Sequence, residues 1–204
     1  MNKIIKDACI LFAITLVAGI VLGAVYNITK GPIAEQNEKA KQTAYREVLS
    51  DADSFEAIDS EKYSEANLAA LGSGLKDTEE DFSKDEVTDV VAGVKNGKIV
   101  GFVITVVAGD GYGGDIKFST GISSDGKYMG TSILSISETA GLGMRAKTDP
   151  AFLAQFNGAS VDKFTVVKDG TGSSSEDKID AIGGSTVTSK AVTKGINTAL
   201  AVFK

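Results

Sequence analysis

The fold of this chain is decided by the stretch Val90-Val91-Ala92-Gly93-Val94-Lys95-Asn96-Gly97-Lys98-Ile99-Val100-Gly101-Phe102-Val103-Ile104-Thr105-Val106. Asn-Gly between two runs rich in β-branched residues is the strongest short signal of a β-hairpin. A second pair of runs, 115–122 and 128–136, turns at Asp125-Gly126 in a similar way. The sequence therefore predicts two successive antiparallel hairpins.

Helical patterns surround these hairpins. Apolar residues recur at helical spacing near the end of the chain and predict an amphipathic helix over 186–203. Asp149-Pro150 is typical of the N-cap and first residue of a short helix, and residues 164–167 predict a short strand. Residues 31–50 predict a helix with Pro32 in its first turn, and a shorter helix is expected near 62–71. Helices beside an antiparallel sheet indicate the α+β class.

A long apolar segment opens the chain. Residues 8–29 carry no charge, and a helix of that length spans roughly 33 Å, enough for a bilayer core of about 30 Å. A cleaved signal peptide would have a shorter apolar core and a small-residue cleavage pattern, which is not found after this segment. We therefore expect a transmembrane helix at 8–29 after a short tail at 1–7. The lysines on its two sides do not decide its orientation.

The composition excludes several kinds of functional site. The chain has no His and a single Cys, which excludes His-based catalytic triads, His-ligated metals or haem, internal disulfides and Cys-rich clusters. The formal net charge of −6 argues against nucleic-acid binding. No catalytic residue and no metal site is predicted. A redox or group-transfer centre would therefore need another kind of anchor.

The first candidate site is the start of the predicted C-terminal helix, Gly183-Gly184-Ser185-Thr186-Val187-Thr188-Ser189. The glycines allow the backbone to approach a bulky group closely. A helix N-terminus offers unpaired N–H donors and the positive end of the helix dipole, and both favour a phosphate. The same residues would also serve as an ordinary Ser/Thr N-cap after a glycine turn. The residues alone leave both interpretations open.

The second candidate site is Ser137-Glu138-Thr139-Ala140-Gly141-Leu142-Gly143-Met144, which follows a predicted strand. Two glycines around one leucine could form a close wall for a flat ligand, with Glu138 and Thr139 supplying hydrogen bonds. The alternative is a plain transition from strand to loop.

Taken in order along the chain, these motifs resemble the FMN-binding domain family. The ordered set comprises the apolar N-terminal segment, the Gly-Tyr-Gly-Gly loop at 111–114, the strand at 116–122, Asp125-Gly126, the Glu-Thr-x-Gly-Leu-Gly stretch at 138–143, the segment 152–158 and the helix start at 180–186. The family includes the G subunit of the Rnf ion-translocating ferredoxin:NAD oxidoreductase complex. It also includes the C subunit of the sodium-pumping NADH:quinone oxidoreductase.

The resemblance implies a covalently bound FMN. In the family, an Asp-x-x-(Ser/Thr)-Gly-Ala-Thr motif carries FMN through a phosphoester on its last Thr, which corresponds to Thr186. Gly183 and Ser185 depart from that motif, and Ser137 and Ala140 stand where the family often has His and Pro. The other expected FMN-binding residues are Glu138, Thr139, Gly141, Leu142, Gly143, Gly184, Ser185, Val187 and Thr188, the first five along the isoalloxazine ring.

The resemblance also implies a function. We expect a membrane-anchored flavoprotein subunit that relays electrons in an Rnf-type ferredoxin:NAD⁺ oxidoreductase coupled to Na⁺ or H⁺ translocation, without stand-alone catalysis. Its soluble part would lie outside the cytoplasm, held on the cell (inner) membrane by one helix. The implied partners are the other Rnf subunits and a flavin transferase that attaches the FMN.

The expected domain organisation follows from the same resemblance. A helical connector and the N-terminal part of the soluble domain occupy 30–85, and the FMN-binding domain occupies 86–204. That domain is expected to be a curved antiparallel sheet with flanking helices. The alternatives are the C subunit of the Na⁺-translocating NADH:quinone oxidoreductase and a non-redox, membrane-anchored interaction protein.

Overall fold

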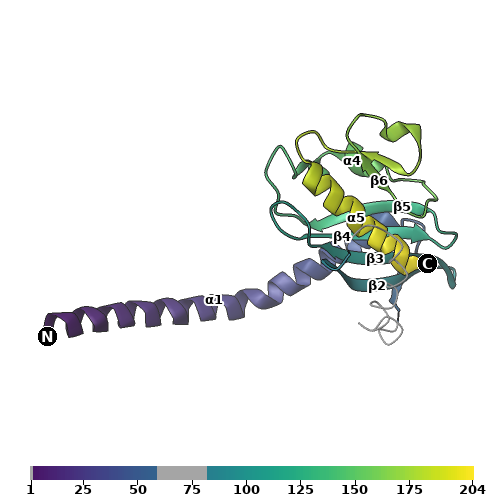
Figure 1. Ribbon diagram of the computed structural model, residues 1–204. Helices are drawn as coiled ribbons and strands as arrows, with labels where there is room; N and C mark the ends of the chain where they lie inside the picture. Colours follow the sequence, from purple (N-terminus) through teal and green to yellow (C-terminus); the bar gives the residue numbers. More distant parts are fainter. Residues whose placement is uncertain (1, 59–81) are drawn as a thin grey trace. The chain divides into compact units, whose positions relative to one another are not determined.

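Two compact units make up the computed structural model, which describes residues 2–58 and 82–204 (Figure 1). The first unit ends at Ala40 and the second begins at Lys41. The helix expected near 62–71 lies outside the described residues.

The N-terminal helix α1 runs without interruption from Asn2 to Val48. By length and composition it can cross a membrane. The predicted start of a separate helix at Pro32 is wrong, because Pro32 lies inside α1. A proline in a helix interior removes one backbone hydrogen bond at a cost of about 3 kcal/mol. The residues around Pro32 are exposed, so the carbonyl group left without a helical partner is open to solvent.

The sheet is an antiparallel meander of five strands in chain order (Figure 1). Its strands are β1 (Ser54–Ala57), β2 (Asp85–Lys95), β3 (Lys98–Ala108), β4 (Ile116–Ser123) and β5 (Tyr128–Ser135). Both predicted hairpins are confirmed, as β2–β3 and β4–β5. Asn96 and Gly97 have φ values of 51° and 74°, the left-handed pair that a two-residue I′ turn requires. Register shifts in both hairpins bend the strands, as expected of a curved sheet.

The remaining elements follow the sheet in sequence. They are α3 (Arg145–Thr148), α4 (Pro150–Ala154), β6 (Thr165–Val167), the 3₁₀ turn η2 (Gly172–Ser174), β7 (Lys178–Asp180) and α5 (Thr186–Phe203). Asp149 caps α4 as predicted, because its carboxylate accepts a hydrogen bond from the Ala151 N–H at 3.1 Å. The parallel pairing of β6 with β7 was not predicted. The C-terminal helix has the predicted bounds.

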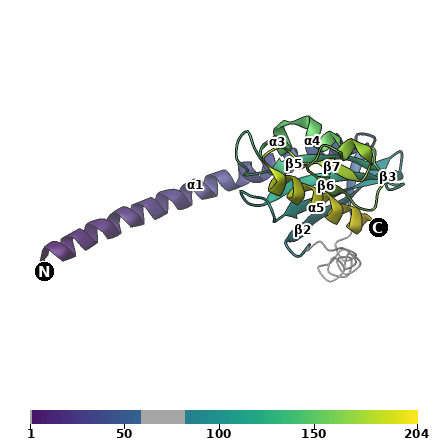
Figure 2. The same cartoon turned by 45° about the horizontal axis from the view of Figure 1, so that its top comes forward.

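Helices cover the two faces of the sheet. In Figures 1 and 2, α5 lies along one face, where it packs on the buried side chains of Ile104 and Phe118. On the other face, Tyr45 and Val48 from the last turns of α1 pack against Val103. Successive residues of a strand point to opposite faces, so β3 is buried on both. This explains its nearly unbroken apolar sequence.

Candidate functional site

The turn that leads from β7 into α5 has a fixed backbone shape. Gly184 adopts a left-handed φ of 77°, and the Ser185 N–H donates to the Ile182 carbonyl at 2.9 Å. The buried Ser189 hydroxyl accepts from the Ile182 N–H and donates to the Ser185 carbonyl, both at 2.9 Å. These bonds hold the start of α5 from within the helix. The first N–H groups of the helix are therefore presented on a rigid turn.

Ser185 occupies the N-cap position of α5 but does not act as a cap. Its side chain makes no capping hydrogen bond, and its buried Oγ has no hydrogen-bond partner. A buried hydroxyl without a partner costs about 1–3 kcal/mol. A phosphate at the helix start would supply acceptors for this hydroxyl and for the first N–H groups of α5. The geometry therefore favours a ligand site over an ordinary N-cap, and the residues present fit a phosphate group.

The two candidate stretches meet at this point. A Cβ placed on Gly143 would lie only 2.6 Å from both Glu138 Oε2 and Thr188 Oγ1. A Cβ on Gly184 would lie 3.2 Å from Leu142 Cδ2. The 137–144 loop therefore packs directly against the first turn of α5. One site results from two segments that are about 40 residues apart in the sequence.

A third segment joins the site through Glu138. This buried side chain accepts a hydrogen bond from the Tyr112 N–H through Oε1 at 2.7 Å. A Cβ on Gly113 would lie 2.1 Å from the Ser137 carbonyl oxygen, so the Gly-Tyr-Gly-Gly loop can approach this backbone only with glycine. The sequence indicated that loop by its glycines but did not connect it to the site.

Replacing Glu138 tests whether its side chain holds the Tyr112 loop against the 137–144 loop. Glu138→Ala leaves the Tyr112 N–H without its acceptor and opens a void, so we expect a loss of about 1–3 kcal/mol in the free energy of unfolding. Glu138→Gln keeps an acceptor oxygen at the same place and should retain most of that stability. Urea denaturation of the full chain in detergent measures both. Equal free energies of unfolding for Glu138→Ala and the unsubstituted chain would show that Glu138 does not hold the Tyr112 loop in place.

The predicted site residues differ in their exposure. Thr139 and Gly141 are exposed, Thr186 is half-buried, and Gly143 and Thr188 are buried. Leu142 and Val187 expose 45% and 50% of their surface although both are apolar. Exposed apolar side chains beside a helix N-terminus are suited to a ligand with a flat apolar part and a phosphate. The half-buried Thr186 lies in the chain directly before the exposed Val187.

An ion-pair network lies beside α5. Lys194 contacts Asp85 at 3.3 Å and also pairs with Asp110, which Lys84 contacts at 2.8 Å. Burial raises the pKa of Asp85, although the Thr198 hydroxyl and Lys194 oppose that rise. Hydrogen bonds from Lys194 and Lys84 lower the pKa of Asp110. The network joins the N-terminal end of β2 and the loop after β3 to α5.

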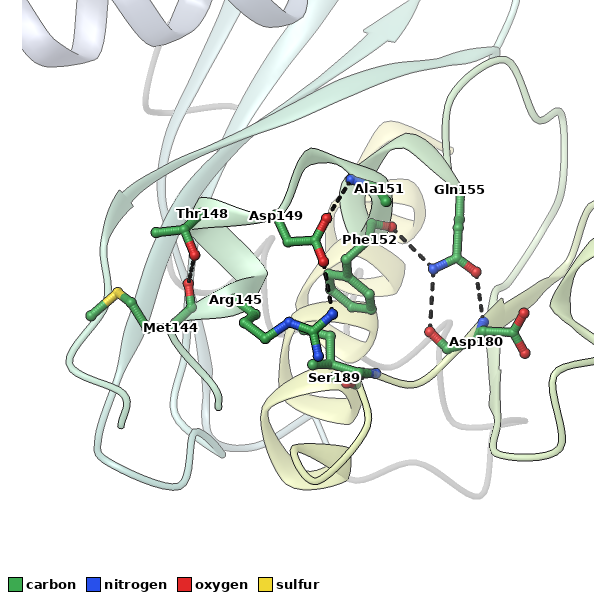
Figure 3. Close-up of polar contacts among 10 residues, drawn as sticks. Met144, Arg145, Thr148, Asp149, Ala151, Phe152, Gln155, Asp180 and Ser189 are labelled. Atoms are coloured by element: carbon green, nitrogen blue, oxygen red, sulfur yellow. Dashed lines mark hydrogen bonds and ion pairs between the residues drawn. The ribbon is translucent and has the colours of Figure 1, made fainter. Parts of the chain in front are cut away.

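On another side of the helix start, a cavity of about 560 Å³ borders Gly183 and Arg145. Figure 3 shows the Arg145 guanidinium turned to Asp149, at 2.8 Å. Hydrogen bonds from Arg145 and from the Ala151 N–H lower the pKa of Asp149. Sequence reasoning did not single out Arg145. It is a cation that lines the same cavity as the turn before α5.

Gln155 fixes the strand that enters the turn (Figure 3). Its side-chain oxygen accepts from the Asp180 N–H at 2.7 Å, and its amide nitrogen donates to the Asp180 carbonyl at 3.2 Å. The Asp180 carboxylate in turn accepts from the Gly172 N–H at 3.0 Å. Asp180 is therefore held by its backbone and its side chain, which positions the turn that leads into α5.

Comparisons with known proteins show the family to which the chain belongs. A model described as FMN-binding domain matches residues 111–201, and one described as RnfG N-terminal region matches residues 1–48. The G subunit of the Na⁺-translocating ferredoxin:NAD⁺ oxidoreductase complex of Acetobacterium woodii is 36% identical over 201 residues, covering 98% of this chain and 92% of that protein. The chain belongs to the RnfG family of subunits of ion-translocating ferredoxin:NAD⁺ oxidoreductase complexes.

Further comparisons concern other relatives of this RnfG-family chain. The G subunit of the proton-translocating ferredoxin:NAD⁺ oxidoreductase complex of Clostridium ljungdahlii is 33% identical, covering 96% of this chain and 92% of that protein. The crystal structure of Shewanella oneidensis NqrC is similar with a TM-score of 0.44 at 22% identity, over 56% of this chain and 55% of that chain. The matched FMN-binding domain contains the Tyr112 loop, the 137–144 loop and the start of α5. The matched N-terminal region contains the apolar helix, as expected of a membrane-anchored subunit.

Proposed function

We propose that this chain is an electron-carrying flavoprotein subunit with FMN attached as a phosphoester to Thr186. It would act within an ion-translocating ferredoxin:NAD⁺ oxidoreductase complex. The single observation that carries the proposal is the start of α5, where the half-buried Thr186 follows a buried N-cap hydroxyl that has no partner. The family membership and the FMN-binding domain match support the choice of FMN.

Each residue of the site has a role in this proposal. Thr186 Oγ1 would hold the FMN phosphate: its bond to phosphorus would replace the pyrophosphate bond of FAD, and AMP would leave with the hydroxyl proton, in a reaction that a flavin transferase catalyses. The α5 N-terminus and the Ser185 hydroxyl stabilise the phosphate. Glu138 and Gly143 hold the neighbouring loop close to the helix. When bound, FMN supplies the redox chemistry, and the protein supplies position and electrostatics.

The proposal includes a location and partners. The soluble part, from Lys41 onward, would lie outside the cytoplasm, with α1 as the single membrane span. The partners would be the other subunits of the complex, as the names of the relatives indicate, and the flavin transferase. A covalent bond keeps the cofactor on a domain from which a dissociated FMN would be lost.

Intact-mass measurement tests the proposal. The full chain is expressed with and without a flavin transferase, purified in detergent and weighed. We expect one added group of about 438 Da, FMN less one water, only with the transferase, together with flavin fluorescence in a denaturing gel. An unchanged mass in both preparations would exclude covalent flavin on this chain.

A further inference from the structure

Gln155 lies outside both candidate stretches, yet its side chain contacts the strand that leads into α5 (Figure 3). It is the half-buried residue that follows α4. Both of its side-chain hydrogen bonds to β7, at 2.7 and 3.2 Å, are made to the backbone of Asp180. Asp180 is the last residue of β7, which pairs only with β6 in a two-stranded sheet. The Gln155 amide therefore satisfies the backbone groups that a third strand would otherwise satisfy.

Gly172 holds the same residue through its side chain. The Gly172 N–H donates to Asp180 Oδ1 at 3.0 Å. A Cβ placed on Gly172 would lie 2.7 Å from both the backbone nitrogen and Oδ2 of Asp180, so only glycine can approach this closely. Two segments, the end of α4 and the turn η2, therefore hold Asp180 in place. Neither segment belongs to the motif at 180–186.

The hold on the backbone continues as far as two glycines. The Ala181 N–H donates to a carbonyl of β6 at 2.9 Å, and the Ile182 N–H is held from within α5. Gly183 and Gly184 follow and are exposed. Glycine has more conformational freedom than any other residue. The restraints on 180–182 therefore decide the direction in which the chain enters the glycines and the place at which Thr186 is presented.

We propose that Gln155 is a positioning residue for the attachment of FMN to Thr186. By holding Asp180, Gln155 fixes the turn and so the direction in which the Thr186 hydroxyl meets the donor. The inference rests on the proposed attachment of FMN. A displacement of about 1 Å at a reacting group can slow a reaction by about 100-fold. Attachment therefore requires a side chain that lies 25 residues before the first residue of the motif.

The test measures the initial rate at which the purified full chain gains FMN in detergent at 25 °C. The chain is mixed with a flavin transferase and FAD, and the product is followed by gel fluorescence and intact mass. Gln155→Met keeps the length of the side chain without its hydrogen-bonding groups, so we expect attachment to be about 10–100-fold slower while circular dichroism stays native. Gln155→Glu keeps the oxygen that accepts the shorter bond. It should react about fivefold faster than Gln155→Met.

Asn197 provides the matched controls. Its side-chain amide also pairs with the N–H and carbonyl of one backbone residue, Phe164, at 2.8 and 3.0 Å. Asn197 lies roughly 16 Å along the axis of α5 from Thr186. Asn197→Leu and the milder Asn197→Asp should therefore lower Tm without slowing attachment at 25 °C.

Three results would overturn the inference. One is an attachment rate for Gln155→Met equal to that of the unsubstituted chain. Another is equal slowing in the Asn197 variants, which would indicate a general loosening of the fold. If Gln155→Met did not fold, an unchanged rate for Gln155→Glu would be the third. Absence of the added mass from the unsubstituted chain would instead overturn FMN attachment itself, before any variant is measured.

Discussion

Replacing Thr186 with Val is expected to remove the attached FMN completely while the fold is retained. The Thr186 hydroxyl is the proposed bond to phosphorus, and valine has a similar shape without an oxygen. Thr186 is half-buried in the first turn of α5 and makes no hydrogen bond essential to the helix start, which Ser189 holds. The full chain co-expressed with a flavin transferase should show neither the added mass nor gel fluorescence, with an unchanged circular dichroism spectrum.

Thr188→Val tests which of two neighbouring hydroxyl groups, on Thr186 or on Thr188, carries the proposed phosphoester. Thr188 exposes 1% of its surface, and its Oγ1 faces the close contact between Gly143 and Glu138. It is therefore enclosed by protein, and its variant should keep the added mass. If Thr186→Val kept the added mass of the attached FMN and Thr188→Val lost it, Thr188 would be the attachment residue.

Among the substitutions described, Gly121→Ala is expected to lower the free energy of unfolding the most. Gly121 on β4 lies beneath the end of α1, where an added Cβ would be 2.2 Å from the Val48 carbonyl oxygen and 2.7 Å from its carbon. These are backbone atoms of a helix end packed on the sheet, so they cannot move aside as a flexible side chain can. Overpacking of this kind costs about 1–3 kcal/mol. We expect the upper end of that range, and a fall in Tm of about 6–10 °C.

Gly183→Ala is the matched control for this substitution. No atom lies within 4 Å of the position of its Cβ, and its φ is not left-handed. Its Tm should stay within about 2 °C of that of the unsubstituted chain. Circular dichroism is a suitable probe because the chain has no Trp. A normal Tm for Gly121→Ala would show that the end of α1 is not seated on the sheet.

The parts of the fold that were predicted are those with strong local signals. The Asn96-Gly97 turn sets the β2–β3 register through its own backbone conformation. The periodicity of α5 reflects the apolar face that it buries on the sheet. By contrast, β1 has four residues and β6 and β7 three each. Such short strands exist only through pairing with a partner that the local sequence does not reveal.

The candidate site residues that were predicted from the sequence also lie in short local motifs. Gly184 and Thr186 were predicted as site residues because they lie in one short motif, and Gly143 was predicted because it lies in another. Arg145 was not singled out because the cavity that it lines is formed by segments that are separate in the sequence. The backbone N–H of Tyr112 carries no sequence signal at all, and only its glycine neighbours marked the loop.

The C-terminal helix α5 follows all five strands of the sheet along the chain. The helix carries the proposed acceptor, Thr186, at its start and buried residues such as Ile196 and Leu200 towards its end. Ribosomes synthesise the chain from its N-terminus, so the sheet is complete before this helix exists. The apolar face of α5 therefore docks on a sheet that has already been synthesised. Under the proposed function, cofactor attachment would then take place only on chains in which α5 has been made and has docked on the sheet.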